Sequence, residues 1–381
     1  MNGYEKSRLM KMWQRIALAL LISGSLGGAA RATVAANSQS PVQVFILLGQ
    51  SNMVGLGLVG PSPEHKGSLE RAVQVDHLYP FLVNSSGGWA ARKNTRFVAV
   101  MSGRKAGGSK AAWDAMCKQH PPSGNILRGV MNMYFNQWLS VKGHRFIGPE
   151  FGISHEIAKV VHGPTLLLKD CNGNRSLGWD LLTPGSKGYT FADSQGRVWQ
   201  YAGYGQSPNR WIKGTTPKPI PFWYAGKEYD MDLYFGKYVL ANISKFYPGS
   251  KTCKIAGFFF WQGEKDLGDM SYARHYQTNL VNYIHDVRRD FNAPNAPFVL
   301  GTLGEAIKGK AKGTESLILK AQLAVANPTL HPEFKGNVAT VYTHPISKGG
   351  SGNGHYNKNA QTYMDVGEAM GKAMDKLLEK K

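Results

Sequence analysis

Apolar and polar positions along this chain follow two periods. Short runs of consecutive apolar residues, each of strand length, lie at 42–48, 164–169, 255–261, 298–303 and 338–342. Longer segments with apolar residues three or four positions apart predict helices at about 148–161, 229–246, 272–290, 315–326 and 359–379. This alternation of strands and helices is typical of an α/β domain built on a parallel sheet.

Two long segments between these elements show no sustained period. Residues 55–145 are rich in Gly, Lys and Trp, and residues 178–227 are rich in Gly, Pro, Trp and Tyr. No internal repeat and no low-complexity linker divides the chain. We therefore expect one domain over residues 37–381, with irregular insertions at about 55–145 and 178–227.

The first 36 residues have the pattern of a secretory signal peptide. Basic residues precede an apolar run at 16–22, and Ala30-Arg31-Ala32 fits a small-x-small cleavage site, with Ala36 as an alternative. The apolar run is shorter than the ~20 residues that a membrane-spanning helix needs, which disfavours an uncleaved anchor. No later run is long enough to span a bilayer. We expect a secreted or periplasmic mature protein with no stable membrane span.

The formal net charge of the chain is +20. Basic proteins often bind nucleic acids or anionic surfaces. Because the sequence has no nucleic-acid-binding motif and no dense Lys/Arg run, we expect no nucleic-acid partner. An anionic polysaccharide partner and a generally basic, soluble surface are the two explanations that remain.

Three cysteines follow the leader, so at most one disulfide can form within the chain. Export would permit such a bond. Cys171 and Cys253 lie in or near predicted core strands, which favours buried free thiols. The third is Cys117.

Polar residues with catalytic chemistry stand at the ends of three predicted elements. Ser51 comes just after the strand at 42–48, Glu264 comes after the strand at 255–261, and His355 comes directly before the last helix. The carboxyl ends of parallel strands form the ligand-binding edge of an open α/β sheet. A serine nucleophile needs a base, and a histidine base needs a carboxylate that fixes its tautomer. Alternatively, Ser51 caps a helix and Glu264 is a surface acid at a helix start.

Four segments together resemble one family. They are G-Q-S-N-M (49–53), L-L-L-K-D-C-N-G-N-R-S-L (166–177), W-Q-G-E-K-D (261–266) and a histidine before the C-terminal helix. In this order they resemble the sialate O-acetylesterase and acetylxylan esterase branch of the SGNH hydrolases. The resemblance covers the chain from about residue 42 to the last helix. It implies a flavodoxin-like three-layer α/β/α fold, and a serine esterase that removes acetyl groups from O-acetylated carbohydrates.

The resemblance also implies roles for individual residues. Ser51 is the expected nucleophile, His355 the base, and Glu264 the acid that orients the imidazole. The oxyanion hole is expected at the backbone N–H groups of Ser51 and Gly173, with the side-chain amide of Gln262 as a third donor. No metal and no other cofactor is implied.

The predicted oxyanion hole departs from the family pattern at two positions. Asn174 takes the place of the second glycine in the second segment, and Gln262 stands where the family has an asparagine. Gly173 also has a simpler interpretation as a turn residue with positive φ.

A third departure concerns the acid. Many SGNH hydrolases have an aspartate three residues before the histidine, where this chain has Gly352. Without that aspartate, we expect the Glu264 carboxylate to hydrogen-bond one ring nitrogen of His355. Asp266 and Asp269 are the rival carboxylates.

The expected substrate contacts are Asn52, next to the nucleophile, and three tryptophans of the segment 178–227. Aromatic faces suit the C–H faces of sugar rings, although rings in a long loop also serve to anchor it. The tryptophans are Trp179, Trp211 and Trp223.

Two other functions fit the same residues. One is a general SGNH lipase or esterase that acts on other acyl chains. The other is a non-catalytic carbohydrate-binding protein on this fold, which the missing aspartate would favour. The presence of both Ser51 and His355 favours an enzyme.

Overall fold

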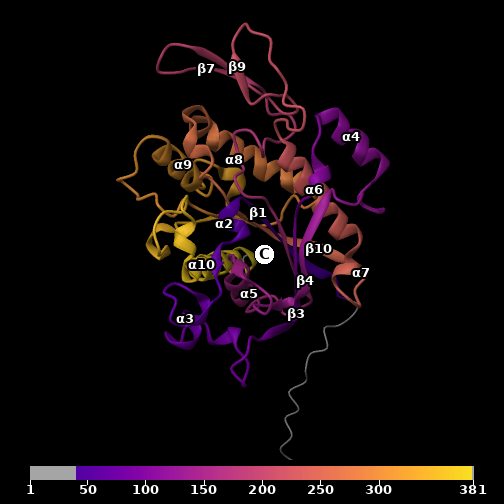
Figure 1. The fold of residues 1–381 in the computed structure, drawn as a ribbon, viewed down its shortest axis with the longest axis vertical. Coiled ribbons are helices and arrows are strands. Elements are labelled where there is room, and N and C mark those ends of the chain that lie inside the picture. Colours follow the sequence, from indigo (N-terminus) through magenta and orange to yellow (C-terminus); the bar gives the residue numbers. More distant parts are fainter. Residues whose placement is uncertain (1–39, 380–381) are drawn as a thin grey trace, which may run out of the picture. The chain divides into compact units, whose positions relative to one another are not determined.

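The protein is described by a computed structural model that covers residues 40–379, so the predicted signal peptide lies outside the described residues. A seven-stranded sheet forms its centre (Figure 1). In sheet order the strands are β12 (Val338–Val341), β11 (Phe298–Gly301), β10 (Cys253–Trp261), β1 (Val42–Gly49), β6 (Thr165–Asp170), β3 (Ala91–Ser102) and β4 (Met131–Ser140).

Six of these strands are parallel, and five of them, β6, β1, β10, β11 and β12, form the middle and one side of the sheet. Numbered among themselves in chain order, these five follow the order 2-1-3-4-5, which is that of flavodoxin. Strand β1 is buried on both faces, with Ile46 in one apolar core and Phe45 in the other. The predicted flavodoxin-like α/β fold with a largely parallel sheet is therefore confirmed.

Strands β3 and β4 extend this sheet beyond β6, although their segment was expected to be irregular. Strand β3 is parallel to β6, and β4 is antiparallel to β3. The expectation was wrong because the first four residues of β3, A-R-K-N, are polar or small and at least partly exposed. Only the following residues are buried, so the apolar run is short. The same segment contains helices α3 (Leu69–Gln74) and α4 (Lys110–Gln119).

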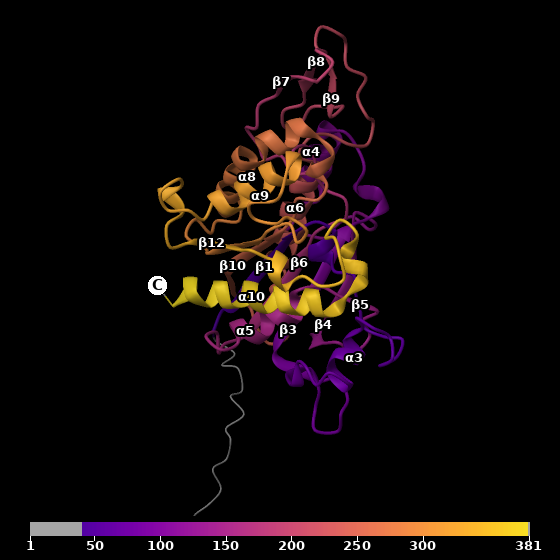
Figure 2. The same cartoon turned by 90° about the vertical axis from the view of Figure 1, so that its left-hand side faces the viewer.

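Helices cover both faces of the sheet (Figures 1 and 2). Helices α6, α8 and α9 pack in one apolar core, and α5 and α10 pack in the other. The predicted helix at 229–246 is interrupted at Asn242. The helix bounds are α5 (Glu150–Ile157), α6 (Lys227–Ala241), α7 (Ile243–Phe246), α8 (Met270–Asp290), α9 (Gly313–Ala324) and α10 (Ala360–Leu378).

The segment 178–227 contains a small antiparallel sheet. Its strands are β7 (Tyr189–Ala192), β8 (Val198–Tyr201) and β9 (Arg210–Ile212). In both views these strands lie beyond α8, away from the central sheet (Figures 1 and 2). Near the end of β1 are α2 (Ser51–Val54) and the pair β2 (Gly57–Leu58) and β5 (Phe146–Ile147). Short 3₁₀ segments lie at Pro80–Leu82, Arg104–Ala106, Asp266–Gly268, Pro332–Phe334, His344–Ile346 and His355–Lys358.

All three cysteines are unpaired, and of these Cys171 is buried while Cys117 and Cys253 are partly exposed. Among residues 40–379, no helix combines the length and the apolar character that crossing a bilayer requires.

Candidate active site

Ser51 lies where β1 ends and the short helix α2 begins. Gly49, the last residue of β1, has a φ of +138°, and a Cβ at this position would lie 2.2 Å from the carbonyl oxygen of Trp261 on β10. A side chain cannot fit there, so the turn into the nucleophile position requires glycine. The N-cap of α2 is Gln50 and not Ser51, which removes the capping alternative.

His355 contacts Ser51 directly. Its ring nitrogen Nε2 lies 2.9 Å from Oγ of Ser51, which is hydrogen-bonding distance for a base and its nucleophile. His355 is the first of four consecutive residues, 355–358, with positive φ. Non-glycine residues in this region cost about 1–2 kcal/mol each. The buried Tyr356 ring stacks on Trp261, with ring centroids 5.8 Å apart, and anchors this strained turn.

A cleft of about 780 Å³ opens around this pair at the carboxyl end of the sheet. Of the other predicted site residues, Gly173 and Glu264 also line it. Four other polar residues line the cleft and were not predicted as site residues. Their only signal was that each is a near neighbour of a predicted residue. They are Gln50, Asn174, Lys265 and Asn353.

The backbone near Ser51 offers free hydrogen-bond donors. A Cβ at Gly173 would lie 3.6 Å from Cβ of Ser51, so the turn after β6 approaches the nucleophile closely. Within residues 40–379, neither the Ser51 N–H nor the Gly173 N–H donates a hydrogen bond. Gly173 itself does not have positive φ, but Asn174 does, with a φ of +60°. Asparagine tolerates this conformation better than most residues, which explains its place in the turn.

Among residues 40–379, no hydrogen bond or ion pair joins Glu264 to the His355 ring. Its Oε1 accepts a hydrogen bond of 2.6 Å from Nδ2 of Asn52, which also donates to the carbonyl oxygen of Gly352 at 3.1 Å. The backbone N–H of His355 donates to the same carbonyl oxygen at 3.0 Å. In the described part of the chain, no hydrogen bond joins Nδ1 of His355 to a carboxylate. The predicted direct bond between Glu264 and His355 is therefore wrong, because the Asn52 amide holds the carboxylate.

A second carboxylate, Glu305, was missed by the sequence analysis. Its Oε2 accepts a hydrogen bond from the backbone N–H of Gly352 at 3.0 Å. A Cβ at Gly352 would lie 2.6 Å from this oxygen and 3.0 Å from Oε1 of Glu264. The two carboxyl groups thus fill the space beside residue 352, and glycine at this position makes room for them.

The two rival carboxylates have structural roles. Asp266 accepts hydrogen bonds from the backbone N–H groups of Leu177 at 2.9 Å and Gly178 at 2.8 Å, and so joins the segment after β6 to the turn after β10. Asp269 is the N-cap of α8. Neither is hydrogen-bonded to His355.

The structure contradicts the predicted oxyanion role of Gln262. Its Nε2 donates to Oδ2 of Asp266 at 2.6 Å and to the carbonyl oxygen of Arg175 at 2.9 Å, while its Oε1 accepts from the hydroxyl of Tyr276 at 2.8 Å. The side chain is buried and does not line the cleft. Both amide atoms are engaged inside the protein, so no donor remains for a substrate.

The structure also contradicts the predicted substrate contact of Asn52, because this side chain is fully buried and both of its amide atoms are hydrogen-bonded internally. Trp179 and Trp223 line a second cleft of about 390 Å³, with ring centroids 6.5 Å apart. This cleft shares Asn174 and Lys265 with the one around Ser51. Trp211, on β9, lines neither of the two clefts.

Burial shifts the protonation of the histidine and of both glutamates. It lowers the pKa of His355, so the ring is neutral near pH 7 and can accept a proton. Burial, together with the neighbouring Glu305 carboxylate, raises the pKa of Glu264 to about 8. Burial also raises the pKa of Glu305. Two adjacent buried carboxyl groups cannot both ionise readily, so this pair holds a proton near neutral pH.

The C-terminal part of the chain matches a known family. Residues 219–376 match the model of the family "Carbohydrate esterase, sialic acid-specific acetylesterase". The matched segment is less than half of the chain, and it contains Glu264 and His355 but not Ser51. This match confirms the predicted resemblance to sialate O-acetylesterases, and it supports carbohydrate O-acetylesterase chemistry at the level of the family.

Solved structures with distant sequences are also similar to this chain. A protein from Arabidopsis thaliana has 16% identity and a TM-score of 0.45, with 88% of this chain and 98% of that chain covered. A carbohydrate acetylesterase from Xanthomonas citri has 13% identity and a TM-score of 0.46, with coverage of 86% and 54%. NanS has 15% identity and a TM-score of 0.36, with coverage of 80% and 78%. The chain thus spans about half of the Xanthomonas enzyme. None of the curated proteins matches the sequence.

Proposed function

We propose that this protein is a serine esterase that hydrolyses O-acetyl esters on carbohydrates. The observation that carries the proposal is the 2.9 Å contact between Nε2 of His355 and Oγ of Ser51 inside an open cleft. The match of residues 219–376 to a carbohydrate esterase family supports the same chemistry.

In this mechanism His355 takes the proton of the Ser51 hydroxyl while Oγ attacks the acetyl carbonyl carbon. The tetrahedral intermediate collapses when the imidazolium returns the proton to the sugar oxygen, which leaves as the alcohol. A water molecule, deprotonated by the same ring, then attacks the acetyl-serine ester. Acetate leaves and Ser51 regains its proton.

The negative charge on the tetrahedral oxygen needs donors that are already in place. The backbone N–H groups of Ser51 and Gly173 fit this role, since both are free of internal hydrogen bonds and Gly173 lies beside the nucleophile. Asn174, which lines the same cleft, is the polar side chain next to them.

Glu264 is proposed as a positioning residue rather than as a direct partner of the imidazole. Its contact with Asn52 fixes the amide that holds the Gly352 carbonyl oxygen, and this oxygen also accepts the backbone N–H of His355. The acid therefore supports the loop that carries the base. It contributes less to the rate than a carboxylate bonded to the ring would.

The cleft lined by Trp179 and Trp223 is proposed to hold a sugar unit next to the acetylated one. It adjoins the catalytic cleft at Asn174 and Lys265, and its indole rings offer apolar faces with polar groups around them. The leader pattern of residues 1–36 supports export of this enzyme to an extracellular or periplasmic space, where polysaccharides are accessible.

The proposal is tested by measuring acetate release by the purified protein from acetylated xylan, from O-acetylated sialic acid and from 4-nitrophenyl acetate. We expect release from at least one of the carbohydrate esters, and turnover of 4-nitrophenyl acetate well above that of the butyrate. A butyrate preference would favour the general esterase. Wild-type protein that releases no acetate from any ester would leave only the carbohydrate-binding alternative.

A further inference from the structure

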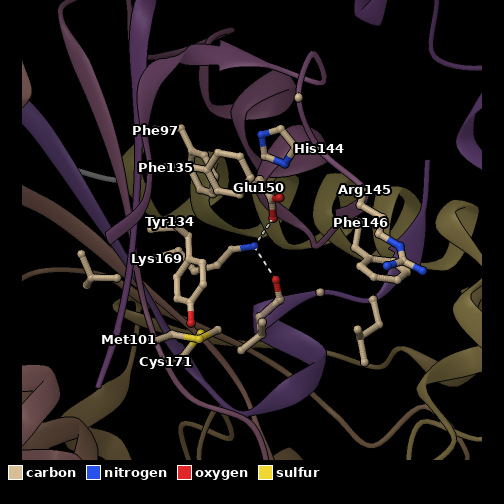
Figure 3. A pocket seen from close by; sticks show the side chains of 16 residues that line it. Phe97, Met101, Tyr134, Phe135, His144, Arg145, Phe146, Glu150, Lys169 and Cys171 are labelled. Carbon is tan, nitrogen blue, oxygen red and sulfur yellow. Dashed lines mark hydrogen bonds and ion pairs between the residues drawn. The ribbon is translucent and has the colours of Figure 1, made fainter. Parts of the chain in front are cut away.

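A separate apolar cavity of about 440 Å³ lies between strands β3, β4 and β6 and the chain that follows α2. Its walls include Phe97, Ala99, Phe135 and Phe146 (Figure 3). Leu56 lines both this cavity and the cleft around Ser51, so the two are neighbours, but neither Ser51 nor His355 lines the apolar cavity. Ligand sites in proteins are concave and mostly apolar, with a few polar groups, and this cavity has that composition.

A buried ion pair forms part of the cavity wall. Nζ of Lys169 donates hydrogen bonds to Oε2 of Glu150 at 2.6 Å and to the carbonyl oxygen of Val54 at 2.8 Å. An ammonium group has three N–H donors, and within residues 40–379 the third has no partner. Figure 3 shows the Lys169 side chain reaching toward the middle of the lining residues. The inner wall therefore presents a donor, and the only lining carboxylate is already neutralised.

The mouth of the cavity is also basic. Tyr134, Gly143 and Arg145 are its exposed lining residues. The Arg145 guanidinium lies 5.2 Å from the centre of the Phe146 ring and, in the described residues, forms no ion pair. Burial lowers the pKa of His144, which stacks on Phe135 with ring centroids 3.9 Å apart, so this histidine adds no charge near pH 7. The lining as a whole thus has one uncompensated positive charge.

We propose that this cavity is a binding site for a small aromatic monocarboxylate. The aromatic ring of the ligand packs against Phe97 and Phe135, and the carboxylate meets Arg145 at the mouth, where it stays partly hydrated. Apolar walls with a single uncompensated cation match an apolar body with a single negative charge. This inference goes beyond the proposed function, because no bond of the ligand forms or breaks here.

The test is isothermal titration calorimetry with 3-phenylpropanoate, with 3-phenylpropan-1-ol as a neutral probe of the same shape. We expect submillimolar binding of the acid and weaker binding of the alcohol. Arg145→Gln should weaken acid binding by about three- to tenfold and leave alcohol binding unchanged, because it removes one charge-assisted contact. Lys142→Gln, in the same exposed loop but outside the lining, is the matched control and should change neither.

Ala99→Phe fills the cavity and should weaken binding of both probes by more than tenfold. If this variant does not fold, the exposed Arg145 variant alone decides the outcome. Failure of the wild-type protein to bind the acid, or acid binding that Arg145→Gln leaves unchanged, would overturn the proposal. Ser51→Ala should bind the acid as the wild type does. Wild-type protein that binds the acid but releases no acetate from any ester would therefore speak against the catalytic proposal alone.

Discussion

The ring nitrogen Nε2 of His355 lies 2.9 Å from the hydroxyl oxygen of Ser51, across 304 positions of sequence. The sheet brings the two together. Ser51 follows the central strand β1, and the turn of His355 packs through Tyr356 on Trp261, at the end of the neighbouring strand β10. The nucleophile and its base are therefore held at the same edge of the sheet, one by the end of β1 and the other by a turn packed on the end of β10.

Replacing Ser51 by alanine should lower kcat for 4-nitrophenyl acetate by about 10⁴-fold or more, because only the oxyanion donors and substrate binding would remain. The circular dichroism spectrum and the melting temperature should stay close to those of the wild type, since the hydroxyl contacts only the partly exposed His355. Ser86→Ala, which changes an exposed serine outside the cleft, is the control. Near-normal turnover by Ser51→Ala would remove this serine from the mechanism.

The acid limb of the pH–rate profile should reflect a histidine without a carboxylate partner. Burial lowers the pKa of His355, and the base must be neutral to work. As pH falls, kcat/KM should therefore decline with a midpoint below 6.5, the ordinary pKa of histidine. Initial rates with 4-nitrophenyl acetate from pH 4.5 to 7.5 give this midpoint. A midpoint at or above 7 would mean that a carboxylate bonds to the ring in the working enzyme.

Glu264→Gln should lower kcat only about tenfold. The glutamine keeps an oxygen that can accept the hydrogen bond from Asn52, and in the described residues the carboxylate forms no hydrogen bond with His355. Loss of a carboxylate bonded to the ring would instead cost about 10⁴-fold in kcat. Steady-state measurement of kcat at pH 7 distinguishes the tenfold loss from the much larger one. A loss of 10³-fold or more would show that Glu264 reaches the imidazole during turnover.

Trp223→Ala should raise KM for a polymeric carbohydrate ester by about three- to tenfold, because one aromatic contact is worth ~1 kcal/mol. KM for 4-nitrophenyl acetate should hardly change, since this small ester does not reach the second cleft. Trp211→Ala is the matched control, because Trp211 lines neither cleft. Equal effects of the two substitutions would place the sugar contacts elsewhere.

The elements of the sheet centre and the places of Ser51 and His355 could be predicted from sequence because both depend on local pattern. Apolar runs mark strands that are buried on both faces, and catalytic side chains follow such strands. Strand β3 was not predicted because its first residues are small or polar and at least partly exposed. Its place beside β6 depends on pairing that no local pattern contains.

The partners of polar side chains were harder to predict than their positions. Gln262 and Glu264 do lie at the expected sheet edge, but Asp266 and Asn52 compete successfully for their hydrogen bonds. Which of several nearby donors and acceptors pair depends on side-chain directions within a few ångströms. Glu305 could not be predicted as a site residue, because the loop after β11 contains no recognisable motif. Its role follows only from its contacts with Gly352 in the structure.

The last prediction concerns the contribution of buried carboxyl groups to stability between pH 6.5 and 8. Burial raises the pKa of Glu264 to about 8 and that of Asp266 to about 7, whereas both would titrate near 4 in the unfolded chain. At these two groups the folded state therefore binds more protons than the unfolded state across this range, and their contribution to the free energy of unfolding should fall as pH rises.

Groups whose pKa is lowered on folding oppose this trend at both ends of the range. Burial lowers the pKa of His144, His155 and His355, so the unfolded state binds more protons at these residues around and below pH 6.5. Burial lowers the pKa of Lys227 to about 8, so its contribution to stability rises with pH from about pH 7 upwards. Urea unfolding at pH 6.5, 7.25 and 8 measures the slope. Glu264→Gln removes one titrating group and should flatten the slope by at most about 1.4 kcal/mol per pH unit. The exposed Asp76→Asn is the control and should leave the slope unchanged. If the slope of Glu264→Gln equals that of the wild type, then Glu264 is already ionised in the folded protein at pH 6.5 and the pair with Glu305 holds no proton.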